Sequence, residues 1–269
     1  MTEPSEARGK RGTRDGRVAG KVCLVTGSTS GIGEGIARHL AEEGARVVVS
    51  GRRAELGEAV AADIRAAGGE AVFHGVDVSR AEDCAAIVAF THSHFGALDA
   101  LVHNAGLSRR GTVLDTSLED WHEVMDVNVT AAFLLAKAAV PIMQLAGGGT
   151  LVHIGSAHTA VPKRNLAAYC ASRGALLMLT KQIAVEYIGD RIRCNLVNPG
   201  WVDTPGERSL LASLGQSTDI LDVAARSNPF GRLLTPRDIA YVVTYLVSDE
   251  SALVTGSVFD VHHEHPLSQ

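Results

Sequence analysis

Hydrophobic and polar positions follow two alternating periods along nearly the whole chain. Short apolar runs rich in Val, Ile and Leu predict buried strands at 21–26, 46–50, 71–76, 99–103, 150–154, 191–197 and 257–261. Between them, apolar residues at helical spacing predict helices at 32–43, 56–67, 80–94, 118–145, 165–188 and 236–247. Strands that alternate with helices are joined by βαβ crossovers, which give a parallel sheet. We therefore expect an α/β fold, a doubly wound and mostly parallel sheet of about seven strands with helices on both faces.

The pattern also predicts one domain with two polar ends. Residues 1–19 are polar and charged without apolar periodicity, so we expect a disordered leader; a basic arm that binds nucleic acid is the alternative, but acidic residues interrupt its positive charges. The domain spans 20–261, and 262–269 is a polar tail. Within the domain, 199–235 is the longest irregular stretch. It is rich in Pro and Gly, and we interpret it as a substrate lid loop.

Composition narrows the class of protein. Hydrophobic residues make up 46% of the chain but aromatic residues only 4%, which suits parallel strands of small aliphatic residues buried on both faces. The net charge of −5 excludes an electrostatic footprint for nucleic acid. We identify no apolar run of the ~20 residues that span a membrane. The four cysteines, Cys23, Cys84, Cys170 and Cys194, form no CxxC pair, so we expect no metal site and no disulfide, as in a reducing cytoplasm.

A glycine-rich turn joins the first strand to the first helix. It reads TGSTSGIG over 26–33. Glycines allow a tight turn and let the backbone approach a pyrophosphate, while the helix N-terminus offers free N–H groups and the positive end of its dipole. In a strand–turn–helix context this arrangement predicts a Rossmann-type dinucleotide site. The residues that we expect to contact the dinucleotide here are Gly27, Ser30, Gly31, Ile32 and Gly33.

The end of the second strand bears on the choice of nucleotide. NAD binders usually carry an acidic residue there that holds the ribose 2′-hydroxyl. This chain reads SGRR over 50–53, so a guanidinium, that of Arg52, stands where it can hold a 2′-phosphate. We therefore expect NADP(H), with NAD(H) as the alternative; solvated surface arginines are the other interpretation. Asp77 and Val78, after the third strand, are candidates for the adenine edge, although Asp77 also suits a loop or N-cap.

Taken together, these motifs resemble the short-chain dehydrogenase/reductase family over about residues 20–261. The turn matches the family's TGxxxGxG, and His103-Asn104-Ala105-Gly106 is similar to its NNAG segment with His in the first position. Asn128 falls at the family's helix asparagine, and Ser156 precedes Tyr169 by thirteen residues. The segment 199–204, PGWVDT, resembles PGxxxT, whose threonine meets the nicotinamide carboxamide in the family. The resemblance implies further cofactor contacts from Asn104, Ala105, Gly106, Tyr169, Arg173, Pro199, Gly200, Val202 and Thr204.

The same residues suit hydride transfer between a nicotinamide and a carbonyl or secondary alcohol. Reduction of a carbonyl needs a proton donor for the developing alkoxide and a hydrogen bond that polarises the oxygen. Tyr169 is the candidate acid and Ser156 the candidate hydrogen-bond donor. A phenol ionises near pH 10, and a cation one helical turn away favours the phenolate. The candidate catalytic residues are Asn128, Ser156, Tyr169 and Arg173.

Arg173 departs from the family's YxxxK motif. The family lysine holds the nicotinamide ribose, favours the phenolate and joins a proton relay. An arginine keeps the charge but is wider and is effectively never deprotonated. Three interpretations follow: a working reductase of reduced activity, a site adapted to dehydration or epimerisation, or a cofactor-binding protein without turnover. Because Asn128, Ser156, Tyr169 and Thr204 remain, we expect the first.

The substrate and the assembly are less constrained. Arg109, Arg110, Lys163, Arg164 and Arg208 would favour an anionic substrate if they converge, but solvated loops explain them equally well. His158 also has two interpretations, as a pocket residue or a loop residue, whereas His153 is expected to face the packing surface of its strand. The long helices at 118–145 and 165–188 are apolar nearly all round, and in the family they form the contacts of dimers or tetramers. The histidines and Glu264 of the tail suggest a metal ligand set, but a polar tail without metal is expected.

Overall fold

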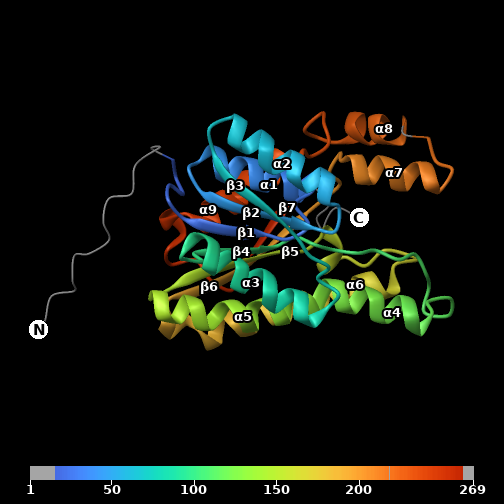
Figure 1. The fold of residues 1–269 in the computed structure, drawn as a ribbon. Helices are drawn as coiled ribbons and strands as arrows, with labels where there is room; N and C mark the ends of the chain where they lie inside the picture. Colours follow the sequence, from blue (N-terminus) through green and yellow to red (C-terminus); the bar gives the residue numbers. More distant parts are fainter. Residues whose placement is uncertain (1–15, 218, 263–269) are drawn as a thin grey trace, which may run out of the picture.

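One parallel sheet forms the centre of the protein (Figure 1). The computed structural model describes residues 16–217 and 219–262. The sheet has seven strands in the order β3-β2-β1-β4-β5-β6-β7, each pair parallel. The strands are β1 Val22–Val25, β2 Arg46–Gly51, β3 Glu70–Gly75, β4 Ala100–His103, β5 Gly149–Ile154, β6 Ile192–Pro199 and β7 Val258–Val261. The prediction of a doubly wound α/β fold is confirmed.

Helices connect successive strands and cover both faces of the sheet (Figure 1). They are α1 Gly31–Glu42, α2 Ala54–Ala66, α3 Ala81–Phe95, α4 Leu118–Met125, α5 Ala131–Ala146, α6 Ala167–Glu186, α7 Pro205–Ser213, α8 Asp219–Ser227 and α9 Pro236–Val247. A π-helical turn, Asp126–Thr130, joins α4 to α5. After β3 the chain returns to the other side of β1 to form β4, so strand order reverses between β1 and β4. Ligands of doubly wound sheets bind at this switch point, outside the carboxyl ends of the strands.

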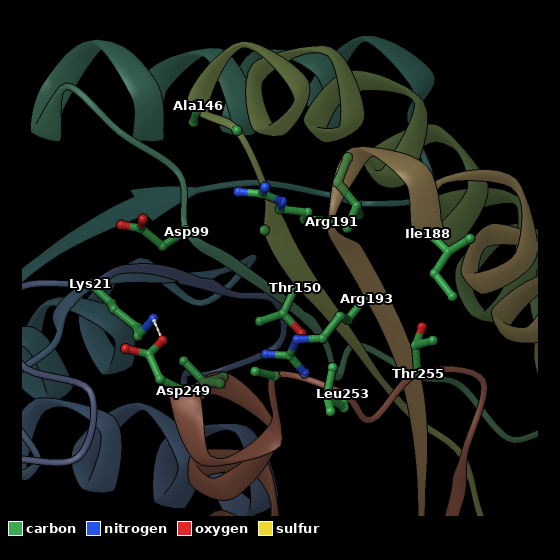
Figure 2. Close-up of a pocket in the computed structure, with 16 residues that line it drawn as sticks. Lys21, Asp99, Ala146, Thr150, Ile188, Arg191, Arg193, Asp249, Leu253 and Thr255 are labelled. Carbon is green, nitrogen blue, oxygen red and sulfur yellow. Dashed lines mark hydrogen bonds and ion pairs between the residues drawn. The ribbon is translucent and has the colours of Figure 1, made fainter. Parts of the chain in front are cut away.

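The opposite, amino-terminal edge of the sheet carries a cavity of about 620 Å³ (Figure 2). Its walls include Lys21, Asp99, Arg191, Arg193 and Asp249. Lys21 Nζ lies 2.7 Å from Asp249 Oδ1. Since every strand is parallel, none of the carboxyl ends faces this cavity, and it is separate from the expected cofactor site.

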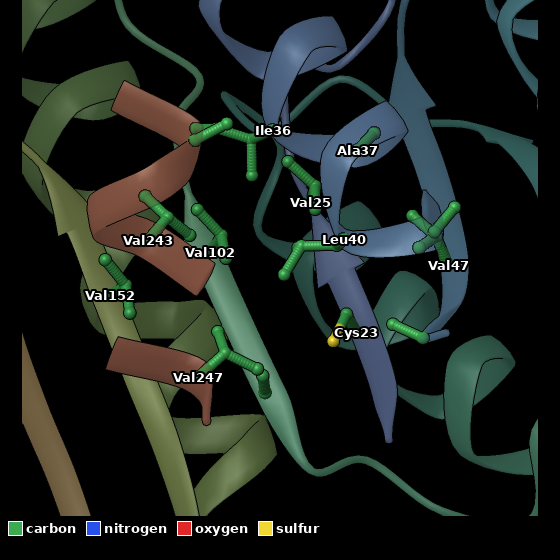
Figure 3. Packing of buried hydrophobic residues seen from close by; sticks show 14 of the residues in the cluster. Cys23, Val25, Ile36, Ala37, Leu40, Val47, Val102, Val152, Val243 and Val247 are labelled. Atoms are coloured by element: carbon green, nitrogen blue, oxygen red, sulfur yellow. The ribbon is translucent and has the colours of Figure 1, made fainter. Parts of the chain in front are cut away.

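Two apolar layers hold the helices on the sheet. On one face, α1, α2 and α9 pack on the strands, and Ile36 and Leu40 of α1 meet Val25, Val102 and Val243 in a buried cluster (Figure 3). On the other face, α3, α5 and α6 cover side chains of the same strands that point the opposite way. Successive residues of a strand alternate between faces, so a strand buried on both sides must be apolar throughout. This explains the continuous Val- and Leu-rich runs of the sequence.

The lid region is more regular than its sequence suggests. The expectation of an irregular loop over 199–235 is wrong, because the segment contains α7 and α8. Thr204 caps α7 by accepting a hydrogen bond from Glu207 N at 3.1 Å, and Pro205 occupies the first turn of the helix. Proline is tolerated in the first turn, so Pro205 begins a helix here rather than breaking one. The two helices share a small apolar cluster of Leu211, Leu221 and Leu233 with Trp201.

The domain boundaries also differ from the prediction. Residues 16–19 are ordered: Val18 is fully buried, and Arg17 Nη2 lies 2.8 Å from Glu250 Oε2. The rest of the expected leader, 1–15, lies outside the described residues. At the other end His262 is described and its side chain is 6% exposed, whereas 263–269 lie outside the described residues.

One helical run passes the length and hydropathy test for a membrane span, contrary to expectation. It extends over Leu118–Ala146, from α4 through the π turn to α5. However, Ala131, Leu135, Ala139 and Met143 are fully buried against the sheet and α3. A core helix of a globular domain passes the same test, and the position of α5 identifies it as one.

Candidate active site

The expected site residues gather at the carboxyl edge of the sheet. The glycine turn follows β1, Arg52 follows β2, Asp77 follows β3, the segment 104–106 follows β4, Ser156 follows β5 and Gly200 follows β6. Adjacent parallel strands end at the same edge, so the topology brings these loops together. The helix α6 carries Tyr169 and Arg173, and Arg173 reaches this edge, since its Nη1 donates to Ile154 O at the end of β5.

The glycine turn is packed too closely for side chains. Gly27 and Gly31 have φ of 64° and 61°, the left-handed region that favours glycine. A Cβ on Gly27 would lie 2.8 Å from Ala105 Cα, and one on Gly33 would lie 2.4 Å from the Gly27 oxygen. Asn104 fixes the turn, since its Nδ2 donates to the carbonyls of Thr26 and Gly27 at 3.0 Å each.

The turn opens onto the first turn of α1. Ser30, the N-cap residue, makes no side-chain capping bond, so the first N–H groups of the helix remain available to an anion. Thr204 lies next to the turn, since a Cβ added to Gly31 would be 3.5 Å from Thr204 Cβ. A parallel bridge between Val202 and Leu234 holds the PGxxxT segment in this position. The geometry forms a cradle that suits a dinucleotide pyrophosphate.

Arg53, rather than Arg52, contacts the glycine turn. Its Nη2 donates to Thr29 Oγ1 at 2.9 Å and also bonds Ser30 Oγ, while Arg52 is exposed. Both arginines are exposed and follow β2, the strand end at which we expect the ribose of the cofactor. Sequence reasoning named only Arg52, although the tandem arginines were the signal for both.

After β3, Asp77 stabilises its own loop. Its Oδ1 accepts from Ser79 N at 3.1 Å and Ser79 Oγ at 2.8 Å, and its backbone N donates to Asp83 Oδ2 at 3.0 Å. Val78 is buried in the apolar cluster on one face of the sheet. The loop interpretation of Asp77 thus has direct support, while contact of Asp77 and Val78 with the adenine edge stays a prediction.

Asn128 sits at the centre of the π turn and is fully buried. Its Oδ1 accepts from Leu107 N at 2.7 Å, and its Nδ2 donates to Leu107 O and to Ser172 Oγ at 2.9 Å each. Ser172 Oγ in turn donates to Tyr169 O at 2.7 Å. Asn128 therefore connects the loop after β4 to the helix that carries Tyr169, which is a positioning role.

Ser156 begins the short 3-10 turn Ala157–Thr159. Its Oγ accepts from His158 N at 3.2 Å, so the hydroxyl proton can be directed to a substrate oxygen. Its backbone N donates to Asn198 Oδ1 at 3.1 Å. Asn198, on β6, also donates from Nδ2 to Asp260 at 2.9 Å. Sequence reasoning missed Asn198, because an asparagine near a strand end has no distinguishing pattern.

Tyr169 and Arg173 stack on one face of α6. The Arg173 guanidinium carbon lies 4.8 Å from the centre of the Tyr169 ring, within cation–π range. Arg173 is 5% exposed, and its Nη1 donates to Ile154 O at 3.1 Å. A Cβ on Gly106 would lie 2.7 Å from Arg173 Nη2, so the guanidinium packs closely against this glycine.

Three histidines lie near these residues. His103 and His153 pair across β4 and β5 and are fully buried. Burial lowers the pKa of His103 to about 3, helped by His153 and by the charge of Arg173, and burial lowers the pKa of His153 to about 4. Both are therefore neutral near pH 7. His158 is half-buried, with its Nδ1 3.1 Å from Val161 O.

The basic residues near the site do not all converge. Arg109 is paired with Glu123 at 2.8 Å and Arg208 with Asp203 at 2.6 Å, so both charges are compensated. The other three basic residues, Arg110, Lys163 and Arg164, are exposed. Their two loops lie side by side, because a parallel bridge joins Gly111 to Leu166. Among the residues that the structure describes, no group of three or more His, Cys, Asp or Glu forms a metal site.

Comparisons with known proteins agree with this geometry. A family model described as enoyl-(acyl carrier protein) reductase matches residues 27–263. The chain is 38% identical to 2-(S)-hydroxypropyl-CoM dehydrogenase 3 of Xanthobacter autotrophicus, over 91% of this chain and 96% of that one. It is 37% identical to the cyclohexanol dehydrogenase of an Acinetobacter species, over 90% and 93% of the two chains.

A solved structure supports the same assignment. L-sorbose reductase from Gluconobacter frateurii, crystallised with NADPH and L-sorbose, superposes with a TM-score of 0.87 at 32% identity, covering 92% of this chain and 97% of its own. Relatives described as members of the SDR family are 35–36% identical over 91% of the chain. The fold, the order of the motifs and these matches establish that the chain belongs to the short-chain dehydrogenase/reductase family of oxidoreductases.

Proposed function

We propose that this protein is an NADP(H)-dependent oxidoreductase that interconverts a small carbonyl compound and its secondary alcohol. The observation that carries the proposal is the stacked pair on α6, because a buried cation lies 4.8 Å from the ring of the candidate acid Tyr169. Arg173 thereby keeps a positive charge next to the candidate acid, at the position of the family lysine. The named activities of its relatives, which are dehydrogenases and reductases, favour turnover over a protein that only binds the cofactor.

The cradle fits a dinucleotide. Neighbouring backbone lies so close to Gly27 and Gly33 that no side chain fits there, which leaves room for a pyrophosphate. The start of α1 has no side-chain cap, so its N–H groups can bind the phosphates. Asn104, Ala105 and Gly106 follow β4 at the same edge of the sheet. Arg52 and Arg53 supply the positive charge for a 2′-phosphate, which supports NADP(H) before NAD(H). When bound, the nicotinamide supplies or accepts a hydride at the substrate carbon.

The protein's own groups manage the proton. In the reductive direction, Ser156 donates a hydrogen bond to the carbonyl oxygen and polarises it. As hydride reaches the carbon, Tyr169 transfers its phenolic proton to that oxygen, which leaves a phenolate and a neutral alcohol. Arg173 keeps its charge beside the Tyr169 ring throughout and gives up no proton, since a guanidinium stays charged. Reprotonation of Tyr169 then needs a donor other than Arg173. This requirement would lower the turnover rate.

Apolar residues on the outer helices support a homo-oligomer, a dimer or tetramer. Phe133, Met178 and Val185, on α5 and α6, are 50%, 62% and 74% exposed. Exposure of large apolar side chains to water is unfavourable, and a second copy of the chain would cover them. The four free thiols are consistent with a reducing, cytoplasmic location.

Thermal unfolding with added nucleotide tests the cofactor proposal. We expect NADPH to raise the unfolding midpoint by several degrees at a concentration where NADH raises it less, because a ligand that binds only the folded state stabilises it. The fragment 2′-AMP, which carries the 2′-phosphate without the nicotinamide half, should raise the unfolding midpoint slightly. 5′-AMP, which lacks the 2′-phosphate, should not raise it. Equal shifts with NADPH and NADH would contradict the preference, and no shift with either would contradict the proposal.

A further inference from the structure

A buried amide, that of Asn198, lies next to the candidate hydrogen-bond donor Ser156. Asn198 is near the carboxyl end of β6 and is 2% exposed. β6 pairs with β5, the strand that leads to Ser156, and on its other side with β7, the last strand. The side chain of Asn198 can therefore connect the two neighbours of its own strand.

The oxygen of this amide holds the backbone of Ser156. Asn198 Oδ1 accepts from Ser156 N at 3.1 Å and from Thr159 Oγ1 at 2.9 Å. No Cβ fits on Gly155, because Asn198 Oδ1 occupies the space that it would need. An amide oxygen has two lone pairs, and both are used here. The oxygen thus packs directly against the peptide that leads into Ser156.

The nitrogen of the amide is held by the last strand. Asn198 Nδ2 donates to Asp260 Oδ1 at 2.9 Å, and the two residues are partners in the β6–β7 register. An ionised carboxylate can only accept hydrogen bonds. Asp260 therefore fixes which end of the amide faces it, and this leaves the oxygen end for Ser156.

The position of the Ser156 backbone determines where its hydroxyl points. Ser156 Oγ accepts from His158 N at 3.2 Å, so the hydroxyl is fixed on one side by the 3-10 turn and the backbone N on the other by Asn198. A hydrogen bond that polarises a reacting carbonyl depends on placement to a fraction of an ångström. A shift of this peptide would therefore weaken the bond to the substrate oxygen.

We propose that Asn198 is a positioning residue for Ser156, and that Asp260, on the last strand, sets the orientation of its amide. Neither residue needs to contact the substrate. Their effect falls on kcat rather than on NADPH affinity, because the bonds of Asn198 lead to Ser156 and not to the glycine turn. The inference rests on the proposed function for this kinetic consequence.

A charge exchange between the two positions tests the proposal. We expect Asn198→Asp to lower kcat about 10- to 100-fold, because a carboxylate there cannot donate to Asp260 and is repelled by it, which displaces the Ser156 peptide. Asp260→Asn alone should cost less than about threefold, since an amide can still accept from Asn198 Nδ2. The double variant Asn198→Asp/Asp260→Asn restores a donor facing an acceptor, so its kcat should return to within about fivefold of the wild type. NADPH affinity should change less than about threefold in all three variants.

The outcomes of this cycle are distinct. A wild-type kcat in Asn198→Asp would overturn the proposal, and so would costs that multiply in the double variant instead of being relieved. Thr159→Val keeps the shape of the side chain but removes a hydroxyl that bonds both Asn198 and Ser156. It serves as a second variant if Asn198→Asp fails to fold. It should lower kcat about fivefold, the cost of one lost hydrogen bond, and an unchanged kcat would again overturn the proposal.

Unfolding midpoints follow the same cycle without turnover. The midpoint of the cofactor-free protein should fall with Asn198→Asp and recover when Asp260→Asn is added. A recovered midpoint in a protein that reduces no carbonyl would sustain the link between the two residues while the proposed function fails. Carbonyl reduction with no recovery of either the midpoint or kcat would overturn the link and leave the proposed function standing.

Discussion

The guanidinium of Arg173 lies over the ring of Tyr169, 4.8 Å from its centre, with its Nη1 bonded to Ile154 O at 3.1 Å. The charge next to the candidate acid is thus fixed from two sides. Asn128 fixes the same helix from a third direction through Ser172. The arrangement supports the proposal that Arg173 serves in place of the family lysine.

Replacing Arg173 separates charge from shape. We expect Arg173→Lys to preserve or raise turnover, because the cation remains and a lysine can also relay a proton. Arg173→Leu should lower kcat by about 10- to 100-fold, the range for loss of a charge-assisted interaction. Steady-state kinetics measure both. Lys181→Leu, an exposed change of the same charge on the same helix, is the control, and an equal loss in the control would contradict the assigned role.

The tandem arginines after β2 should set the nucleotide preference. We expect Arg52→Ala to raise the KM for NADPH about tenfold or more and leave that for NADH nearly unchanged, because one charge-assisted bond to a phosphate is worth about 1.5–3 kcal/mol. Arg53→Ala should affect both nucleotides, since Arg53 also holds Thr29 and Ser30 of the turn. Arg80→Ala, an exposed arginine paired with Glu82, is the control. Unchanged preference in Arg52→Ala would refute this assignment.

Much of the fold could be predicted from the sequence, because parallel strands buried on both faces leave a continuous apolar run and helices an apolar stripe. The missed helix α7 shows the limit: Thr204 and Pro205 begin a helix, but an isolated proline and glycine are equally typical of a loop. Val18 shows a second limit of the sequence pattern. A single apolar residue in a polar segment gives no periodicity, yet Val18 is fully buried.

Part of the candidate site could also be predicted from the sequence, because some of its residues occur at fixed spacings along the chain. Motif spacing identified Ser156 and Tyr169 as candidates, but no spacing places Asn198 beneath Ser156 or Arg173 against Ile154 O. These contacts join strands and helices that are distant in sequence. They arise only when the sheet is assembled, which is why residue patterns along one chain could not reveal them.

Buried histidines should make the fold sensitive to acid. The pKa of His103 is lowered to about 3 and that of His153 to about 4, so the unfolded chain binds these protons more readily below pH 6.5. Their contribution to stability is present above about pH 6.5 and is lost as pH falls toward 4. Urea unfolding between pH 7.5 and 4.5 measures the loss.

A matched variant identifies the source of that loss. His103→Asn should flatten the pH dependence of the free energy of unfolding, because one titrating group is removed. His92→Gln, at an exposed position on α3, should leave the dependence unchanged. An equally steep profile in His103→Asn would show that other groups control acid unfolding.

The four thiols should differ in reactivity. Burial raises the pKa of the Cys84 thiol to about 11 and raises that of Cys23 and Cys194 further, whereas Cys170 is half-buried. We expect a thiol reagent such as DTNB to modify Cys170 alone in the native protein and all four after unfolding. Mass spectrometry of the labelled peptides gives the answer, and rapid native labelling of Cys23 or Cys194 would contradict the described core.

The most direct test of the account is the rate of NADPH oxidation at 340 nm against a panel of ketones and aldehydes, some with and some without an anionic group, in the wild-type protein and in Tyr169→Phe. The account predicts carbonyl-dependent oxidation by the wild type and its loss, by about a thousandfold or to the background rate, in Tyr169→Phe, because removal of the general acid forfeits proton transfer. NADPH should still bind this variant. Carbonyl reduction that survives in Tyr169→Phe would contradict the account.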